Sequence, residues 1–405
     1  MDRCKAEETI QALRICCNLQ RHYEVILTEN LVERAATVLA DCIGSRPALI
    51  VSTPTVAHLY GRILQQQLKS LGLRVPMTVV PCTERSKTMR QVEHICADAY
   101  AHNLGRSAML VGLGGGVCTD LVTMAASLIR RGISYIRIPT TLLGQVDAAI
   151  GIKGAVNTRY KKSALGCFYP PEAVFIYPFF LKTLPLRHLS SGVAEIIKVA
   201  LVCDGGLFSL LEQHVLKLVQ SRFTCSSEIS RKVIWSSIQG LLQELRNNLY
   251  EDKSYERLMD FGHTFSPLLE ARSRFRLSHG EAVGIDIALT VALASEFGWL
   301  TEQDRDRAVS VITASGLAIE SELLTEELCT ESFRETTLHR AGTLNLVLPT
   351  ALGRAGFVKQ AHDVPSCHIR SALAWLSSGE GLSLSRPGPQ VHRRELAKDS
   401  AAALA

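Results

Sequence analysis

The sequence lacks the features that mark several common classes of protein. Its twelve cysteines include no C-x-x-C pair, so neither a zinc site of that type nor a dithiol redox motif is predicted. No stretch approaches 18 uninterrupted apolar residues, and the opening M-D-R-C-K-A-E-E-T-I has no apolar core of the signal-peptide kind. The net charge is only +5, with no basic arm, which argues against a dedicated nucleic-acid binder. We therefore expect a soluble cytoplasmic protein with no membrane or nucleic-acid partner.

Length and apolar content predict two globular domains. With 405 residues, of which 47% are hydrophobic, the chain can bury one large core or two moderate ones. From Tyr23 to about Thr183, short β-rich runs alternate with helical stretches. The runs are Y-E-V-I-L, A-L-I-V-S, V-P-M-T-V-V, S-A-M-L-V-G-L and Y-I-R-I-P. Strands separated by helices predict a parallel sheet with right-handed crossovers, so the first domain is α/β and Rossmann-like.

After L-K-T-L-P-L-R the pattern becomes mostly helical. The predicted helices are Leu186 to Leu201, Leu207 to Val219, Ile229 to Arg246, and Gly280 to Phe297. These features divide the chain into a Rossmann-like domain over 1–184 and a mostly α-helical domain over 185–380. Residues 381–405 are rich in Pro, Ala and charge, and we expect them to form a disordered tail.

A glycine-rich turn, A-M-L-V-G-L-G-G-G-V-C-T-D, is the first candidate for chemistry. A hydrophobic strand leads into glycines and then into a helix, where bare backbone amides can approach a pyrophosphate. The motif is not G-x-G-x-x-G, because Val117 takes the third position. A turn that merely lets strand and helix pack is an equal alternative on the residues alone.

The segment from Pro139 to Asn157 is the second candidate. It is rich in glycine and small residues, and it carries Asp147 and Lys153 six residues apart. Such a segment suggests a binding loop in which the carboxylate holds hydroxyls and the ammonium holds a phosphate. The residues alone favour the alternative, a solvated loop whose charges have no role.

Three further residues suggest a metal site in the helical domain. Glu195 and Lys198 stand one turn apart on an otherwise apolar helix, S-G-V-A-E-I-I-K-V-A-L. A surface ion pair is the usual alternative, but the apolar flanks suggest that this face is inside, and a buried carboxylate must be paired or bound to metal. His263 and His279 each lie at the edge of a predicted helix. A lone histidine is more often structural, yet one Glu and two His form a plausible zinc set with open coordination positions.

Taken in order, G-G-G-V-C-T-D, P-T-T-L-L-G-Q-V-D, G-V-A-E-I-I-K, D-F-G-H-T-F and H-G-E-A-V resemble the sugar phosphate cyclases, the superfamily of 3-dehydroquinate synthase. The resemblance covers about residues 20 to 375. It implies an N-terminal Rossmann-like domain that holds NAD, a helical domain that holds zinc (with Co²⁺ as a possible substitute), and a cleft between them. It also implies a homodimer.

The resemblance assigns roles to individual residues. The zinc ligands would be Glu195, His263 and His279. The NAD-binding residues would be Glu84, Lys87, Gly114, Gly115, Gly116, Asp120, Thr140 and Thr141. The substrate would be lined by Asp147, Lys153, Asn157, Lys162 and Lys198, and Arg131 would reach the phosphate of a neighbouring subunit.

The implied reaction is a multistep cyclisation with no net redox change. The carbon that bears a hydroxyl loses hydride to NAD while the hydroxyl loses its proton, and the resulting ketone acidifies the adjacent carbon so that phosphate leaves. The hydride then returns, the ring opens, and an intramolecular aldol step closes a carbocycle.

Departures from the dehydroquinate synthase pattern indicate the substrate. Pro267 stands where those enzymes have a second histidine, Leu242 replaces a lysine, Glu256 replaces an arginine and Asp260 replaces an asparagine. Fewer cations and more carboxylates would repel the carboxylate of the dehydroquinate precursor. We therefore expect a sugar phosphate with a neutral head group.

The motifs E-L-x-x-N-L-Y-E and D-F-G-H-T-F-S-P resemble the sedoheptulose 7-phosphate cyclases, above all those that make 2-epi-5-epi-valiolone. Two other products of that substrate stay open, 2-epi-valiolone and desmethyl-4-deoxygadusol. Further alternatives are a 3-dehydroquinate synthase with relaxed motifs, a homologue that has lost catalysis, and an alcohol dehydrogenase-like oxidoreductase. Thr53, Gly154 and Ser163 are additional departures from the family pattern.

Overall fold

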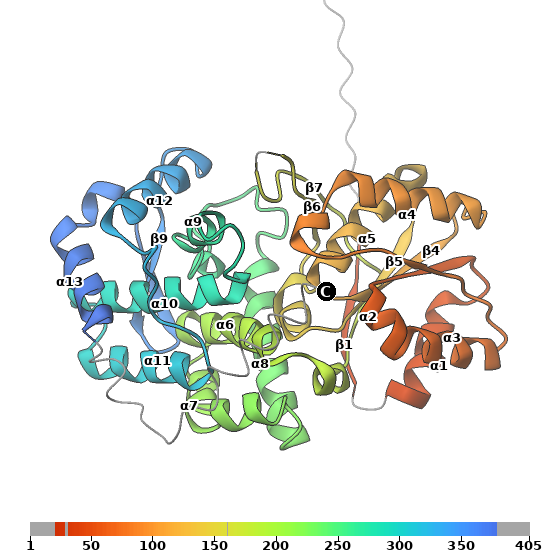
Figure 1. Ribbon diagram of the computed structural model, residues 1–405, viewed down its shortest axis with the longest axis horizontal. Coiled ribbons are helices and arrows are strands. Elements are labelled where there is room, and N and C mark those ends of the chain that lie inside the picture. Colours follow the sequence, from red (N-terminus) through yellow and green to blue (C-terminus); the bar gives the residue numbers. More distant parts are fainter. Residues whose placement is uncertain (1–20, 29–30, 160, 379–405) are drawn as a thin grey trace, which may run out of the picture.

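The computed structural model describes residues 21–28, 31–159 and 161–378, so the predicted tail over 381–405 lies outside the described residues. An α/β lobe, coloured red to yellow, stands beside a mostly helical lobe, coloured green to blue (Figure 1). Within the described ranges, no helix is long and apolar enough to cross a bilayer. The predicted fold class, a Rossmann-like parallel sheet followed by a helical region, is confirmed.

A six-stranded parallel sheet forms the centre of the α/β lobe. Its order is β1-β8-β5-β4-β2-β3. All of its pairings are parallel. The five predicted strands all form. The strands are β1 (Glu24–Leu27), β2 (Ala48–Ser52), β3 (Met77–Val79), β4 (Met109–Gly114), β5 (Ser134–Pro139) and β8 (Ala173–Ile176). The analysis of the sequence missed β8, whose A-V-F-I is fully buried and too short to show a period.

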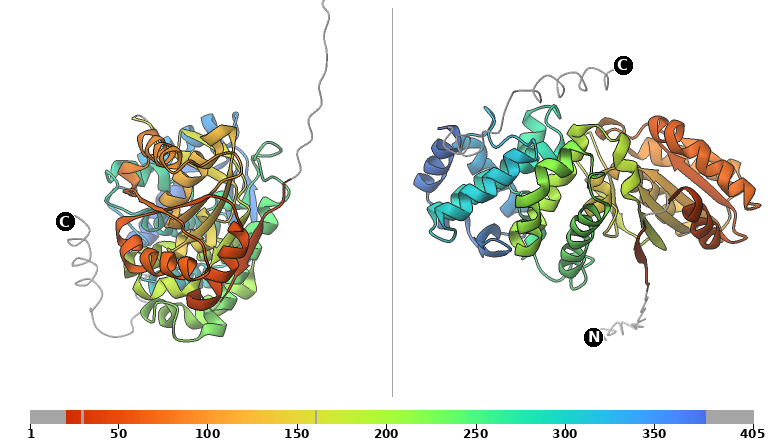
Figure 2. Two further views of the ribbon diagram at one scale, coloured as in Figure 1. Left: turned by 90° about the vertical axis from the view of Figure 1, so that its right-hand side faces the viewer. Right: turned by 90° about the horizontal axis from the view of Figure 1, so that it is seen from below.

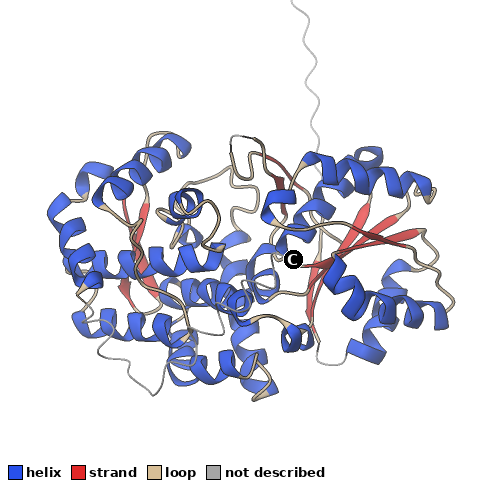
Figure 3. Cartoon of the chain, viewed as in Figure 1, coloured by secondary structure: helices blue, strands red, loops and turns tan. Residues whose placement is uncertain are grey.

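Helices cover both faces of the sheet because its central strands are apolar on both faces. Leu49 and Val51 of β2 pack toward α4 and α5, whereas Ile50 packs toward α1 and α3, as the two-residue period of a strand requires. Figure 3 shows the sheet strands flanked by these helices. The helices of this lobe are α1 (Leu31–Ile43), α2 (Pro54–Val56), α3 (Arg62–Ser70), α4 (Met89–Ala101) and α5 (Gly116–Leu128).

The segment expected to be a binding loop contains regular structure. A π-helical turn, η4, spans Gly144–Ala148, and an antiparallel hairpin follows it, formed by β6 (Lys153–Val156) and β7 (Leu165–Phe168). Arg137, fully buried in β5, donates to the carbonyl oxygens of Ala149 and Lys153 at 3.0 and 2.8 Å. This arginine fixes the backbone that presents Lys153. Its position inside an apolar strand was a signal that the analysis of the sequence left unused.

The helical lobe is built around α6 and α10, which are buried along most of their length. The four predicted helices form, as α6, α7, α8 and α10, but the hairpin of β9 and β10 was missed. The elements of this lobe are α6 (Leu186–Val202), α7 (Gly205–Gln220), α8 (Ser227–Leu245), α9 (Ser266–Arg272), α10 (His279–Glu296), α11 (Glu302–Ala314), α12 (Glu326–His339), β9 (Leu346–Ala351), β10 (Arg354–Val358) and α13 (Ser366–Ser377).

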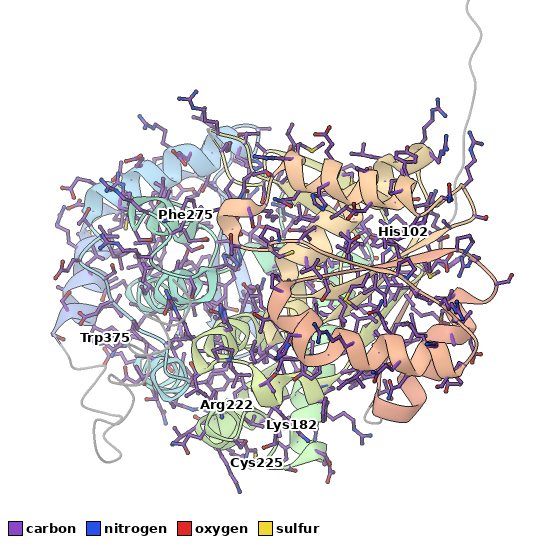
Figure 4. The ribbon with its side chains drawn as sticks, turned by 45° about the vertical axis from the view of Figure 1, so that its right-hand side comes forward. His102, Lys182, Arg222, Cys225, Phe275 and Trp375 are labelled. Carbon is purple, nitrogen blue, oxygen red and sulfur yellow. The ribbon has the colours of Figure 1, made fainter. Side chains whose placement is uncertain are left out.

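The two lobes share one hydrophobic core. Leu142, Val146 and Ile176 of the α/β lobe belong to the same buried cluster as Ile197 of α6 and Ile238 of α8. The right view of Figure 2 shows the lobes side by side, and Figure 4 labels His102 on the α/β lobe and Trp375 on the helical lobe. The domain boundary near residue 184 stays a prediction, although α6 begins at Leu186, after the last sheet strand.

The crossing of α6 and α10 is unusually close at Gly280. A Cβ atom added there would lie 2.2 Å from Ser191 Cα and 2.4 Å from the Ser191 carbonyl oxygen. Both contacts are with α6 backbone, which cannot rotate away. Because α6 carries Glu195 and α10 carries His279, this glycine sets the distance between two predicted metal ligands.

We therefore expect Gly280→Ala to push α6 and α10 apart and to lower the free energy of unfolding by about 1–3 kcal/mol. Chemical denaturation of the purified variant measures the effect. Gly105→Ala is the matched control, because a Cβ at that position meets nothing within 4 Å. Equal stability of the two variants would show that the crossing is not constrained by Gly280.

Candidate metal centre and active-site cavity

Glu195, His263 and His279 converge in the folded chain. Their ligand atoms all lie within 4.8 Å of one another, although the residues are up to 84 positions apart. The Nε2 atoms of His279 and His263 lie 3.2 and 3.7 Å from Glu195 Oε1. The structure thus brings together the three residues that were predicted to bind zinc.

The surroundings of Glu195 fit a bound cation. Its side chain is 1% exposed, and neither of its carboxylate oxygens accepts a geometrically sound hydrogen bond from the residues that the structure describes. Lys198 Nζ lies 2.5 Å from Oε2, whereas Oε1 faces the two imidazoles. A buried carboxylate oxygen without a donor is costly, and a divalent ion held with two histidine nitrogens removes that cost.

The outer nitrogen of each imidazole is held by the protein. His263 Nδ1 lies 3.0 Å from the carbonyl oxygen of Phe261, and His279 Nδ1 lies 2.9 Å from Glu270 Oε1. When Nδ1 donates to these acceptors, Nε2 is left with its lone pair directed at Glu195. In that tautomer, both rings can ligate a metal.

Glu270 is a residue of the site that the analysis of the sequence missed. It is 4% exposed, and its Oε2 lies 2.6 Å from Lys162 Nζ while Oε1 faces His279. Burial would raise its pKa, but the contacts with His279 and Lys162 outweigh burial and lower it to about 2. The available signal was its place seven residues after His263 in F-G-H-T-F-S-P-L-L-E.

Asp286 of α10 holds the loop that carries His263 through hydrogen bonds. This buried carboxylate accepts the backbone N–H groups of Phe265 and Ser266 at 2.5 and 2.8 Å, and burial raises its pKa to about 6. Pro267 follows in the first turn of α9, where its missing N–H has no helical partner to lose. The proline in place of a second histidine thus lies in the first turn of a helix, and His279 of α10 is the third member of the cluster with Glu195 and His263.

A cavity of about 550 Å³ lies between the lobes and reaches His263. Of the predicted site residues, Asp120, Asp147, Lys153, Lys198 and His263 line it, together with Arg257, Glu251 and Glu256. Burial would lower the pKa of Lys198, but the carboxylates of Asp147 and Glu195 raise it above its usual range. Lys198 is therefore a fixed cation at neutral pH.

The predicted substrate residues Asn157 and Lys162 contact other site residues instead of lining this cavity. Asn157 Nδ2 donates to Glu84 Oε1 at 2.8 Å, and its Oδ1 accepts the backbone N–H of Ser163 at 2.7 Å. Lys162 reaches Glu270 and, through it, the predicted metal ligand His279. Arg131 lies beyond the far end of α5, is exposed and has a φ of 69°. Its role across a subunit interface stays a prediction.

The residues predicted to hold NAD gather where β4 meets α5. Gly114 ends the strand, Gly115 precedes the helix and Gly116 begins it. Beside them, Lys87 Nζ lies 2.5 Å from Asp120 Oδ2. The threonines support the turn, because the Thr140 N–H donates to the Gly114 carbonyl and Thr141 Oγ1 accepts the Gly144 N–H.

Close packing at this turn leaves no room for side chains. Cβ atoms at Gly114 and Gly115 would lie 2.6 Å from Cys118 Cβ and 3.0 Å from Thr141 Cγ2. The free N–H groups at the start of α5 are therefore open to a close approach by an anionic group.

Sequence analysis explained the exclusion of a carboxylate-bearing substrate by a loss of cations and a gain of free carboxylates at Leu242, Glu256 and Asp260. The structure contradicts this explanation at all three positions. Leu242 packs against the core cluster and does not line the cavity. Glu256 is paired with Lys359, and Asp260 is held by Arg257 and Arg340 at 2.9 and 2.8 Å. These carboxylates are neutralised by cations of the protein and leave no unpaired negative charge.

Comparisons with known proteins agree with this geometry. Residues 77–191 match the family described as 3-dehydroquinate synthase N-terminal, and residues 192–337 match 3-dehydroquinate synthase C-terminal. The chain is 39% identical to a 2-epi-5-epi-valiolone synthase of Streptomyces hygroscopicus, over 90% of both chains. A solved structure of that organism's 2-epi-5-epi-valiolone synthase, with NAD⁺ and Zn²⁺ bound, matches with a TM-score of 0.85 and covers 91% of this chain and 100% of that one. Identity to a 3-dehydroquinate synthase of Helicobacter hepaticus is 32%, over 82% of this chain and 91% of that one.

Because Glu270 fixes the His279 ring, we expect Glu270→Gln to weaken zinc binding about 10–100-fold. Competition with a chromophoric chelator measures the dissociation constant without any need for turnover. Glu331→Gln is the control, since Glu331 pairs with Arg272 at the end of α9 and touches neither histidine. Unchanged zinc affinity in Glu270→Gln would show that Glu270 does not position the ligand.

Proposed function

The chain belongs to the 3-dehydroquinate synthase family, and from that premise we propose that it converts sedoheptulose 7-phosphate into the C7 cyclitol 2-epi-5-epi-valiolone with loss of phosphate. The observation that carries the proposal is the cluster of Glu195, His263 and His279 beside a cavity that also presents Lys153, Lys198 and Asp147. The substrate assignment is supported by the higher identity to 2-epi-5-epi-valiolone synthases than to the 3-dehydroquinate synthase.

The residues present fit two groups, a divalent cation and NAD. The three ligand atoms around the unpartnered Glu195 oxygen suit zinc, with Co²⁺ as a substitute, and the glycine turn with Lys87 and Asp120 suits a dinucleotide. When bound, zinc supplies a Lewis acid for substrate oxygens and NAD supplies a reversible hydride acceptor.

The chain's own residues bind and orient the sugar phosphate. Lys198 is buried and lies 2.5 Å from the Glu195 carboxylate, so its ammonium can hold and polarise substrate oxygens. Lys153 is 57% exposed at the start of β6, where its ammonium can meet an incoming phosphate. Asp147, on the π-helical turn, faces the same cavity and can accept hydrogen bonds from substrate hydroxyls.

The proposal extends to assembly and location. We propose a cytoplasmic homodimer in which the exposed Arg131 contributes to the phosphate site of the neighbouring subunit. The position of Arg131 away from the cavity of its own chain is consistent with such a role.

Purified protein loaded with zinc and NAD should release phosphate from sedoheptulose 7-phosphate and form 2-epi-5-epi-valiolone, which NMR of the product distinguishes from its epimer. We expect no net NADH, because the hydride returns. We also expect His279→Ala to reduce turnover to the background of metal-free protein while its circular dichroism stays native.

Phosphate release from the 3-dehydroquinate precursor alone would overturn the substrate assignment. Full activity of His279→Ala would remove this residue from the metal site, and net accumulation of NADH would indicate an oxidoreductase instead.

A further inference from the structure

The cations that line the cavity, among the residues that the structure describes, are all paired with carboxylates of the protein. Lys198 is held by Glu195 at 2.5 Å. Lys153 forms an ion pair with Glu251, and Arg257 Nη1 lies 2.6 Å from Glu251 Oε2. An anionic substrate must therefore take a cation away from a protein carboxylate. Which pair gives way decides how many anionic groups the cavity accepts.

Unlike Glu195, whose partner Lys198 lies on the same helix, Glu251 joins the two lobes. Its partner Lys153 belongs to β6 of the α/β lobe, which Figure 1 places at the junction, and its partner Arg257 precedes Asp260 in the helical lobe. Beside this bridge, the ring of Tyr250 packs 5.8 Å from the ring of Phe168 in β7. The segment around Glu251 thus closes one side of the cavity against the hairpin.

The backbone holds Glu251 in this position. Its φ of 55° lies in the left-handed region, which a glutamate rarely adopts unless the surrounding structure imposes it. The Glu251 N–H donates to the Asn248 carbonyl oxygen at 3.0 Å. Asn248 in turn accepts the Lys253 N–H and donates to the Ser254 carbonyl oxygen. These hydrogen bonds fix the backbone of Glu251, and with it the direction in which the carboxylate points.

The two partners of Glu251 are not equally available. Lys153 is 57% exposed and has Glu251 as its recorded ion-pair partner. Arg257 is 20% exposed and is also held by Asp260 at 2.9 Å. A phosphate can draw the flexible Lys153 ammonium away while Glu251 stays with Arg257. A second anionic group would need Arg257, which two carboxylates already hold.

We propose that Glu251 is a positioning residue that limits the cavity to substrates with a single anionic group. It acts through Lys153 and Arg257 and takes no part in the chemistry. This inference rests on the proposed function, because it explains why a sugar phosphate with a neutral head group is accepted and a carboxylate-bearing one is refused. It also replaces the earlier explanation, which relied on Leu242, Glu256 and Asp260.

Glu256 offers a direct comparison with Glu251. It also lines the cavity, but its side chain is 50% exposed, and its single recorded partner, Lys359, is 48% exposed. Solvent screens such a pair strongly. Replacing Glu256 removes one formal charge from the cavity rim without releasing Lys153 or Arg257, so it separates the effect of net charge from the effect of the bridge.

The test measures equilibrium binding to the holoenzyme loaded with zinc and NADH. Because NADH cannot accept a hydride, the ligands bind without reacting. Calorimetry gives the Kd of sedoheptulose 7-phosphate and the Kd of the 3-dehydroquinate precursor, which carries a carboxylate as well as a phosphate. We expect Glu251→Gln to shift the ratio of the two constants about tenfold toward the precursor. Glu256→Gln should leave the ratio within about twofold of the wild-type value.

The inference would be overturned if Glu251→Gln kept the wild-type ratio of the two dissociation constants, whether both constants stayed the same or both fell equally. A shift in Glu256→Gln but not in Glu251→Gln would restore the earlier explanation. If Glu251→Gln does not fold, Glu251→Asp replaces it in the test, because the shorter carboxylate cannot reach both cations. We expect this variant to shift the ratio of the two constants in the same direction by a smaller factor. The proposed function fails separately, if the wild-type holoenzyme prefers the precursor and releases phosphate only from it.

Discussion

The buried carboxylate of Glu195 constrains the arrangement of the whole helical lobe. It sits on α6 with one oxygen against Lys198 and the other facing two imidazoles. Because an uncompensated buried charge is expensive, the elements that carry these partners must stay in place. The close crossing at Gly280 sets α10 and His279 against α6, and Asp286 holds the turn that follows His263.

A second level of organisation links this centre to the α/β lobe. Lys162, next to the β6–β7 hairpin, reaches His279 through Glu270, and Lys153 at the start of the same hairpin reaches Arg257 through Glu251. Both links pass through a carboxylate that bridges the lobes. Since the cavity lies between the lobes, a substrate that engages Lys153 contacts an ion pair that spans both lobes.

The sequence predicted the parts of this structure that leave a local pattern. Five strands and four helices showed their periods, and Glu195, His263 and His279 stood in motifs of the family. β8 was missed because four apolar residues carry no readable period, and the β9–β10 hairpin was missed within a region dominated by helices. Glu270, Arg137 and Glu251 were missed because their roles depend on partners that lie 6 to 108 positions away and meet them only after folding. The sequence also led to a wrong conclusion about charge. Glu256 and Asp260 look like free anions in the sequence, but in the structure each is paired with a cation.

The central claim is that three side chains from separate segments share one divalent ion. A crystal structure of the zinc-loaded protein, with anomalous data collected on both sides of the zinc absorption edge, tests it most directly. The account predicts one anomalous peak about 2.0–2.2 Å from Nε2 of His263, Nε2 of His279 and a carboxylate oxygen of Glu195. A fully loaded crystal with its zinc bound elsewhere, or with one of these three side chains turned away from it, would contradict the account.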